Sequence, residues 1–452
     1  MNQNQKTNRK IILIILITGA FFASLSQSLL SSAIPSIITE FQINASVAQW
    51  LTSAYILTLG VVCTITPYLI NKYPTKNLFQ ASMLIFLIGS ILSYISTNFI
   101  TLLISRLIQG LGTGILFSLM QVMILYLYPK NEHGKALSYI GLVVGFAPSL
   151  GPTLSGIIVD LSGWRTIFQL LIIVSTITIL FAQKFLPKDA GEKYTTKMDF
   201  LSAGIIALSI MLLMLAITNI TTNKLTIDTI TILITGIILF ILFAYRQIKL
   251  EIPLLNIKLF KDRKFLIVNL IIYISFICWM SGYLLVPLLL QSGLKYTATI
   301  SGLVMLPANI LYAVLSPKGG QFYDKYGGKP TIIIGAILLL IGTIPFTLFN
   351  TNTTLLEITI FYILRLQGLV FMIMPLVAYA VSNLPQKEYT HGMGIINSNR
   401  QIFGALITTI LIAFVTISSK NATVSTTGTN HAFTVQVILI IFSILLVGFL
   451  KD

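Results

Sequence analysis

Long apolar stretches separated by short polar connectors run through the whole chain. A stretch of about twenty apolar residues is long enough to cross the hydrocarbon core of a bilayer as a helix. Such stretches lie near residues 11–34, 47–70, 78–97, 99–127, 135–160 and 166–186, then 200–220 and 227–245, then 266–291, 299–317, 330–350, 355–381, 392–417 and 432–450. The pattern predicts an all-α polytopic membrane protein with fourteen spans.

Two charged connectors divide these stretches into three units. The first, KFLPKDAGEKYTTKMD, follows the sixth span, and the second, RQIKLEIPLLNIKLFKDRKF, follows the eighth. We therefore expect an N-terminal six-helix half at 1–190, two additional helices with their linkers at 191–262, and a C-terminal six-helix half at 263–452.

Short motifs recur in corresponding places of the two halves. ISRLIQG at 104–110 matches ILRLQG at 363–368, and NKYPTK at 71–76 matches DKYGGK at 324–329. An internal repeat of this kind is typical of transporters in which parallel halves surround a central pathway.

The composition agrees with a membrane protein, because 56% of the 452 residues are hydrophobic and only 9% are charged. The formal charge of +16 comes from short basic clusters between apolar segments, which indicates topology signals rather than nucleic-acid binding. In the predicted threading, 22 of the 29 Lys and Arg residues share a side with both termini and four lie on the other side. This asymmetry places both termini in the cytoplasm. The two cysteines and three histidines are scattered and predict no metal or redox site.

The fifth predicted span contains an unusual run of small residues, GLVVGFAPSLGPTLSG at 141–156. At about 100° per residue, one face of a helix would carry Gly141, Gly145, Pro148, Pro152, Ser155 and Gly156, with Gly151 outside that face. Such bare backbone should pack closely against another helix or line a polar cavity. A simple packing seam of small residues is the alternative.

The order of these motifs resembles the major facilitator superfamily, and in particular its fourteen-span multidrug:proton antiporters, the QacA-like group. The motifs that carry the resemblance are GQFYDKYGGKP at 320–330, LLISRLIQGLGTG at 102–114, GFAPSLGPTLSG at 145–156, WRTIF at 164–168, IPLLNIKLF at 252–260 and GIINSNRQIFG at 394–404. The chain departs from the family at two usually acidic positions, which hold Ser26 and Asn71.

The resemblance implies a proton-coupled secondary transporter, not an enzyme, that exports amphiphilic drugs or toxic compounds from a bacterial cytoplasmic membrane by alternating access. The chain lacks a GxxxxGK[ST] phosphate-binding motif, so we expect no cofactor and no direct use of ATP. The expected partners are small amphiphiles, protons and the bilayer, without nucleic acid, and the oligomeric state stays open. The alternatives are an exporter or flippase of an endogenous lipid or metabolite, a passive channel and a non-transporting membrane scaffold.

Several side chains are candidates for gating and proton coupling. Asp324 with Lys325 could hold the cytoplasmic side shut if the carboxylate pairs with a basic residue or a helix N-terminus, although a solvated turn would have the same composition. Gly145, Pro148, Gly151 and Pro152 are expected to form the interface between the halves. The proton-coupling candidates are acids near the outer ends of spans and one embedded arginine: Glu40, Asp160, Asp228, Glu357 and Arg106. Each of these acids could equally be an ordinary interfacial carboxylate.

A largely apolar cavity with a few hydrogen-bonding groups would suit an exporter that accepts many substrates. The candidate cavity residues are Ser26, Gln27, Gln109, Tyr283, Met372, Arg365 and Arg400. An embedded arginine costs at least about 2.5–3.5 kcal/mol on insertion scales, so Arg106, Arg365 and Arg400 require partners, water or a function. The shortage of interior acids favours monocationic, zwitterionic or neutral amphiphiles over multivalent cations as substrates.

Overall fold

The computed structural model describes residues 3–30, 33–43, 45–187, 199–222, 226–251, 253–401, 403 and 426–450, and this part of the chain contains helices and no strands. The helices are α1 (Gln3–Leu29), α2 (Ile34–Phe41), α3 (Ala45–Lys72), α4 (Thr75–Tyr94), α5 (Phe99–Leu127), α6 (His133–Ser138), α7 (Ala147–Ser162), α8 (Arg165–Phe185), α9 (Phe200–Thr222), α10 (Ile227–Lys249), α11 (Arg263–Leu288), α12 (Ala298–Tyr326), α13 (Gly328–Thr343), α14 (Leu355–Val381) and α16 (Thr426–Gly448). Residues 389–401 are also helical.

Among the described residues, eleven helices are long and apolar enough to cross a membrane. The predicted span at 135–160 is not one of them, because a π-helical turn at Leu142–Phe146 interrupts the helix between α6 and α7. Pro148 explains the turn, since it has no N–H to bond the Val144 carbonyl and the backbone widens there. The predicted span at 200–220 is represented by a shorter apolar helix, Phe200–Ala216. Most of the span at 392–417 lies outside the described residues, so the count of fourteen stays a prediction.

The first predicted span differs from the structure at its end. The apolar run continues past residue 30, but α1 ends at Leu29 and a separate short helix, α2, begins at Ile34. Pro35 lies in the first turn of α2, where a missing N–H does no harm, whereas in the interior of a longer helix it would break a hydrogen bond.

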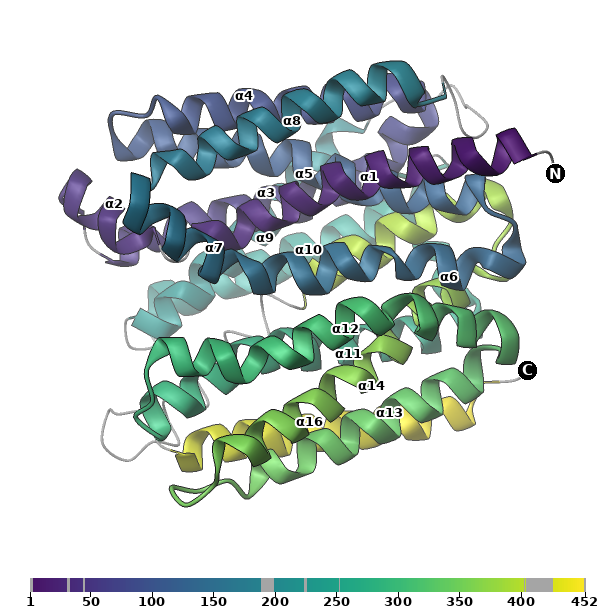
Figure 1. The fold of residues 1–452 in the computed structure, drawn as a ribbon. Coiled ribbons are helices and arrows are strands. Elements are labelled where there is room, and N and C mark those ends of the chain that lie inside the picture. Colours follow the sequence, from purple (N-terminus) through teal and green to yellow (C-terminus); the bar gives the residue numbers. More distant parts are fainter. Residues whose placement is uncertain are drawn as a thin grey trace.

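The helices form two groups that lie side by side (Figure 1). The first group consists of α1 and α3–α8, in which α5 packs against α3 and α4, and α1 packs against α7 and α8. The second group consists of α11–α14, the helical segment 389–401 and α16, in which α14 packs against α11, α12 and α13 and the segment contacts α11. Of the two additional helices, α9 packs against α3, and α10 packs against α9. The exact unit boundaries at 190 and 262 stay predictions.

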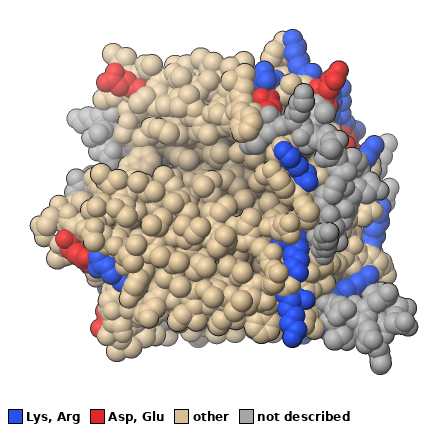
Figure 2. Space-filling model, turned by 90° about the horizontal axis from the view of Figure 1, so that it is seen from above, with Lys and Arg blue, Asp and Glu red and all other residues tan. Residues whose placement is uncertain are grey.

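Both termini lie at the same end of the helices (Figure 1). Figure 2 shows Lys and Arg gathered at this end of the visible face, and a broad band without charge between the two ends. We call the end with both termini the basic end. The helix termini at this end carry Lys72, Lys76, Lys249, Lys325 and Lys329. A charge-free band between two polar ends is what a bilayer requires of a spanning protein.

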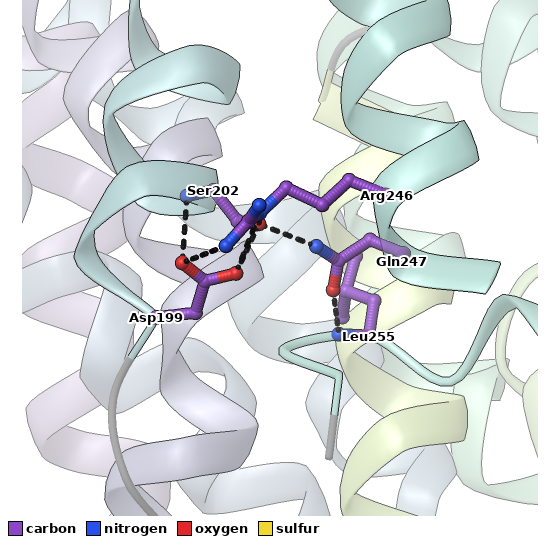
Figure 3. Close-up of polar contacts among 5 residues, drawn as sticks. All are labelled: Asp199, Ser202, Arg246, Gln247 and Leu255. Atoms are coloured by element: carbon purple, nitrogen blue, oxygen red, sulfur yellow. Dashed lines mark hydrogen bonds and ion pairs between the residues drawn. The ribbon is translucent and has the colours of Figure 1, made fainter. Parts of the chain in front are cut away.

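A polar cluster at the basic end fastens the two additional helices together (Figure 3). Asp199 precedes α9, and its carboxylate accepts two hydrogen bonds from the Arg246 guanidinium of α10, at 3.0 and 3.1 Å. Ser202 donates its hydroxyl to Asp199 and accepts from Gln247, whose side-chain oxygen accepts from the Leu255 amide at 3.2 Å. The cluster therefore also holds the linker that leads to α11.

Candidate functional site

A cavity of about 270 Å³ lies between the two groups of helices. Its described lining residues come from α1 (Ser24, Gln27, Ser28), α3 (Thr52, Leu59), α5 (Thr113, Phe117), α11 (Phe276, Trp279, Met280, Tyr283) and the helical segment 389–401 (Arg400, Gln401). Apolar and aromatic walls with a few polar groups are typical of sites that bind small organic molecules. The arrangement provides a site for an amphiphilic ligand, with contributions from both groups.

The structure separates the predicted cavity residues. Gln27, Tyr283 and Arg400 line the cavity, whereas four others are not among its described lining residues: Ser26, Gln109, Met372 and Arg365. Met372 is fully buried and packs against α13, where its Cγ would lie 2.6 Å from a Cβ added at Gly335. Sequence reasoning missed the contributions of α3, α5 and Trp279, because nothing in the apolar pattern distinguishes a cavity-facing side chain from a packed one.

Arg106 is completely buried inside the first group and its guanidinium is bonded on all sides. Nη1 donates to the Ser26 hydroxyl at 3.0 Å and to Gln109 Oε1 at 2.7 Å, while Nη2 donates to the Ser26 carbonyl at 3.2 Å. Nε donates to the Leu51 carbonyl at 3.3 Å, and the guanidinium lies 4.3 Å from the centroid of the Tyr55 ring. The partners are neutral, so Arg106 joins α1, α3 and α5 without an acid.

Arg365 has the corresponding position in the second group. Its Nε donates to the Thr343 hydroxyl of α13 at 3.2 Å, and its Nη2 donates to the Cys278 carbonyl of α11 at 2.5 Å and to the Gln436 side chain of α16. Each of these two arginines, on α5 and α14, therefore bonds a carbonyl of the first helix of its own group. The repeated RLIQG and RLQG motifs correspond to a repeated structural role.

Asp324 lies in the last turn of α12 and reaches the first group. Its two carboxylate oxygens accept hydrogen bonds from the backbone N–H groups of Gly134 and Lys135, both at 2.8 Å. The sequence left either a basic residue such as Lys325 or a helix N-terminus as the partner of this carboxylate. The Gly134 and Lys135 amides belong to the first turn of α6, whereas the Lys325 ammonium lies 4.9 Å from the centroid of the Tyr326 ring. Backbone amides are therefore the described partners of Asp324, and they belong to the opposite group.

Other hydrogen bonds join the groups on the same side of the cavity. The Ser316 hydroxyl of α12 donates to the Ser138 carbonyl of α6 at 2.7 Å. Asn397 donates from Nδ2 to Gln121 Oε1 at 3.1 Å, and the Tyr126 hydroxyl donates to the Gln386 carbonyl at 3.3 Å. Together with Asp324, these bonds hold the groups against each other between the cavity and the basic end.

The small-residue run at 141–156 has two different partners. A Cβ added at Gly145 would lie 2.1 Å from Cε1 of Tyr312 in α12, so this glycine permits close approach of the second group. A Cβ added at Gly151 would lie 1.9 Å from Oγ of Ser28 in α1, within the first group. The side chains of Pro148 and Pro152 lie outside the described residues. The run therefore contacts the second group at Gly145 and packs within the first group at Gly151.

The acids predicted for proton coupling lie away from the cavity. Glu40 pairs with Arg165, with Oε1 2.7 Å from Nη2, and its Oε2 accepts from Trp164 Nε1 at 2.7 Å. The hydrogen bond from Arg165 lowers the pKa of Glu40, and the bond from Trp164 adds to this against the opposing effect of burial. Glu357 caps α14 in a reciprocal pair of bonds with Thr354 and is exposed.

Asp160 on α7 and Asp228 in the first turn of α10 are also exposed. None of the described residues that line the cavity is acidic. Arg106, the fifth coupling candidate, has no acid among the partners described above. Proton coupling by any of these five residues stays a prediction.

Comparisons with known proteins place this architecture in a family. Residues 16–408 match the Major Facilitator Superfamily. The chain is 33% identical over 426 residues to the uncharacterized MFS-type transporter YcnB of Bacillus subtilis (strain 168), covering 94% of this chain and 90% of YcnB. It is 31% identical over 425 residues to the lincomycin resistance protein LmrB of Listeria innocua, covering 93% and 90%.

A third relative, the riboflavin transporter RibZ of Clostridioides difficile (strain 630), is 28% identical over 404 residues, covering 89% of this chain and 88% of RibZ. Among solved structures, the proton:xylose symporter XylE is similar with a TM-score of 0.66 at 13% identity, covering 98% of this chain and 95% of XylE, which shows the fold alone. The chain therefore belongs to the Major Facilitator Superfamily and is a multi-pass membrane transporter rather than an enzyme.

Proposed function

We propose that this protein exports amphiphilic drugs or related toxic compounds by alternating access, in exchange for protons, across a bacterial cytoplasmic membrane with both termini on the cytoplasmic side. The observation that carries this proposal is the cavity between the two groups together with the bonds that close it toward the basic end. A largely apolar site between two helical groups that can rock apart is the geometry that alternating access requires.

Asp324 is the proposed cytoplasmic latch. Its carboxylate bonds the Gly134 and Lys135 amides across the groups, so these bonds must break when the cavity opens toward the basic end. Charge-assisted hydrogen bonds of this kind are stronger than neutral ones, so they stabilise the arrangement that is closed toward the basic end. The relative LmrB, named for lincomycin resistance, supports export of a toxic compound.

The second candidate function is transport of an endogenous metabolite or lipid, which the relative RibZ, a riboflavin transporter, favours. The cavity accommodates either class, since its walls are apolar and its polar groups are few. A passive channel or a scaffold without transport is less consistent with these hydrogen bonds between the groups, because neither function requires the cavity to open and close.

Purified protein in liposomes tests these alternatives. We expect amphiphilic dyes or fluoroquinolone-like compounds to accumulate when a pH gradient is imposed, and a protonophore to abolish the accumulation. Movement of riboflavin but of no dye would favour the metabolite transporter. Downhill movement indifferent to the gradient would overturn proton exchange and indicate a channel. If no compound moves, the exporter proposal fails in favour of a scaffold. Empty liposomes and an Asp324→Asn variant are the controls.

A further inference from the structure

Among the described residues, three arginines are the largest side chains that are almost completely buried, and they differ in their partners. The guanidinium of Arg106 is bonded through Nε, Nη1 and Nη2, and that of Arg365 through Nε and Nη2, while Arg365 Nη1 has no hydrogen-bond partner among the described residues. Arg400 is only 2% exposed, yet neither its Nε nor its Nη1 has a hydrogen-bond partner among the described residues. Arg400 is also the one of the three that lines the cavity.

A guanidinium with two unpaired nitrogen donors is costly in such surroundings. Moving a charge out of water is unfavourable unless a counter-charge and hydrogen bonds compensate the lost hydration. The described groups near Arg400 are aromatic or weakly polar: its Cζ lies 4.6 Å from the centroid of the Phe276 ring, and Tyr273, Tyr312 and Cys63 are close enough to interact with its charge. A ring face attracts the cation but leaves N–H donors without acceptors.

The described lining of the cavity contains one formal charge, that of Arg400, and no acid. A cationic ligand in this cavity would meet a like charge at low dielectric, whereas an anionic ligand would supply the missing acceptors. Arginine is well suited to this task, because its planar fork can donate two parallel hydrogen bonds to a carboxylate, sulfonate or phosphate.

We propose that Arg400 binds the anionic group of an amphiphilic substrate, whose apolar part lies against Phe276 and Trp279. This inference rests on the proposed transport function and narrows its substrate class. It departs from the monocationic, zwitterionic or neutral amphiphiles that the sequence favours. The reason is that the tertiary structure places in the cavity a buried arginine with two unpaired donors.

Gln401 follows Arg400 in the lining, and Ser24 and Gln27 of α1 also contribute to it. These side chains can hydrogen-bond the polar part of a ligand without adding charge. The site therefore combines one cation, a few neutral polar groups and aromatic walls, which is the chemistry expected for a small aromatic or alkyl acid.

Equilibrium binding to the purified protein in detergent tests the proposal independently of transport. Three probes share one fluorophore and differ in the end group: dansylglycine carries a carboxylate, dansylglycinamide is neutral, and dansylethylenediamine carries an ammonium. Energy transfer from Trp279 reports binding, and its loss in Trp279→Phe localises the signal to the cavity. We expect dansylglycine to bind the unmodified protein about 10- to 100-fold more tightly than the amide, as hydrogen bonds to charged groups imply. We expect the ammonium probe to bind most weakly.

Arg400→Gln should remove the preference for dansylglycine, and Arg400→Lys should keep part of it. Arg165→Gln, which lies away from the cavity at the end opposite the basic end, should keep all of it. Displacement of dansylglycine by 2-naphthoate identifies a small organic acid as the occupant, and displacement by dihexanoylphosphatidylglycerol alone identifies a lipid headgroup. Equal binding of the three probes to the unmodified protein, or tighter binding of the ammonium probe, overturns the proposal even if Arg400→Gln does not fold. If dansylglycine binds more tightly than the other two probes but no compound moves in the pH-gradient assay, proton exchange is refuted and the proposed role of Arg400 in binding is supported.

Discussion

Ser26 accepts two hydrogen bonds from Arg106, one at its hydroxyl at 3.0 Å and one at its carbonyl at 3.2 Å. A neutral residue therefore satisfies the embedded arginine at the position where the resemblance to the antiporter group led us to expect an acid. The consequence is structural: Arg106 connects α1 to α5, and no acid is among its described hydrogen-bond partners.

Arg106→Gln should destabilise the protein, because it leaves the Ser26 and Leu51 carbonyls without their donor. Each buried polar group left unpaired costs about 1–3 kcal/mol, so the apparent melting temperature in detergent should fall clearly. Lys295→Gln is the control, since Lys295 is exposed and an exposed cation contributes little to stability. Equal melting temperatures for the two variants would contradict the structural role of Arg106.

Asp324→Asn should reduce exchange at least about tenfold, because two charge-assisted bonds to the Gly134 and Lys135 amides become neutral ones or are lost. Membrane insertion should be unchanged. The measurement is gradient-driven uptake in liposomes at matched protein content. Glu132→Gln is the control, since Glu132 is an exposed acid in the neighbouring loop. Near-normal exchange by Asp324→Asn would remove the latch role.

Gly145→Ala should abolish exchange without preventing insertion, because the added methyl group would overlap the Tyr312 ring of α12. Gly156→Ala is the matched control in the same run, since a Cβ there meets no atom within 4 Å. The double variant Gly145→Ala with Tyr312→Ala should recover part of the exchange. Gly151→Ala should instead lower the melting temperature, because its clash with Ser28 lies within the first group. Normal exchange by Gly145→Ala would show that the contact between Gly145 and Tyr312 is only a packing contact and has no role in transport.

Glu40→Gln should leave gradient-driven transport near neutral pH intact. The hydrogen bond from Arg165 lowers the pKa of Glu40, so the carboxylate stays ionised in this conformation and does not exchange protons at neutral pH. A group with a lowered folded pKa contributes stability above its unfolded pKa, and this contribution is lost as the pH falls through the folded value. A variant that transports but no longer responds to the pH gradient would restore Glu40 as the proton carrier.

Asp199 should make the docking of α9 and α10 sensitive to acid. Burial raises the pKa of this carboxyl, but the bonds from Arg246 and Ser202 outweigh burial and lower the pKa from 3.8 to about 2. The stabilisation is therefore complete above the unfolded value of 3.8 and is lost as the pH falls toward 2. Asp199→Asn should lower the melting temperature at neutral pH and flatten its decline between these values. An unchanged acid profile would show that the cluster contributes nothing.

Much of the architecture follows from the sequence because the signals are local. The length of each apolar run determines whether a helix can cross a membrane, and eleven described helices meet that requirement. The basic clusters determine the polar end that Figure 2 shows. The repeat around Arg106 and Arg365 is visible as a motif, and the two side chains have matching partners in the two groups.

Only the tertiary structure decided which side chains meet. Asp324 bonds an amide 190 residues away in the chain, and Arg106 bonds a serine 80 residues away. Hydrophobic periodicity does not distinguish Met372, which packs against α13, from Tyr283, which lines the cavity, because both belong to apolar helices. The partner of a buried charge depends on helices brought together by packing. For this reason the sequence established that Arg400 is embedded, and the fold established that it lines the cavity with two donors unpaired.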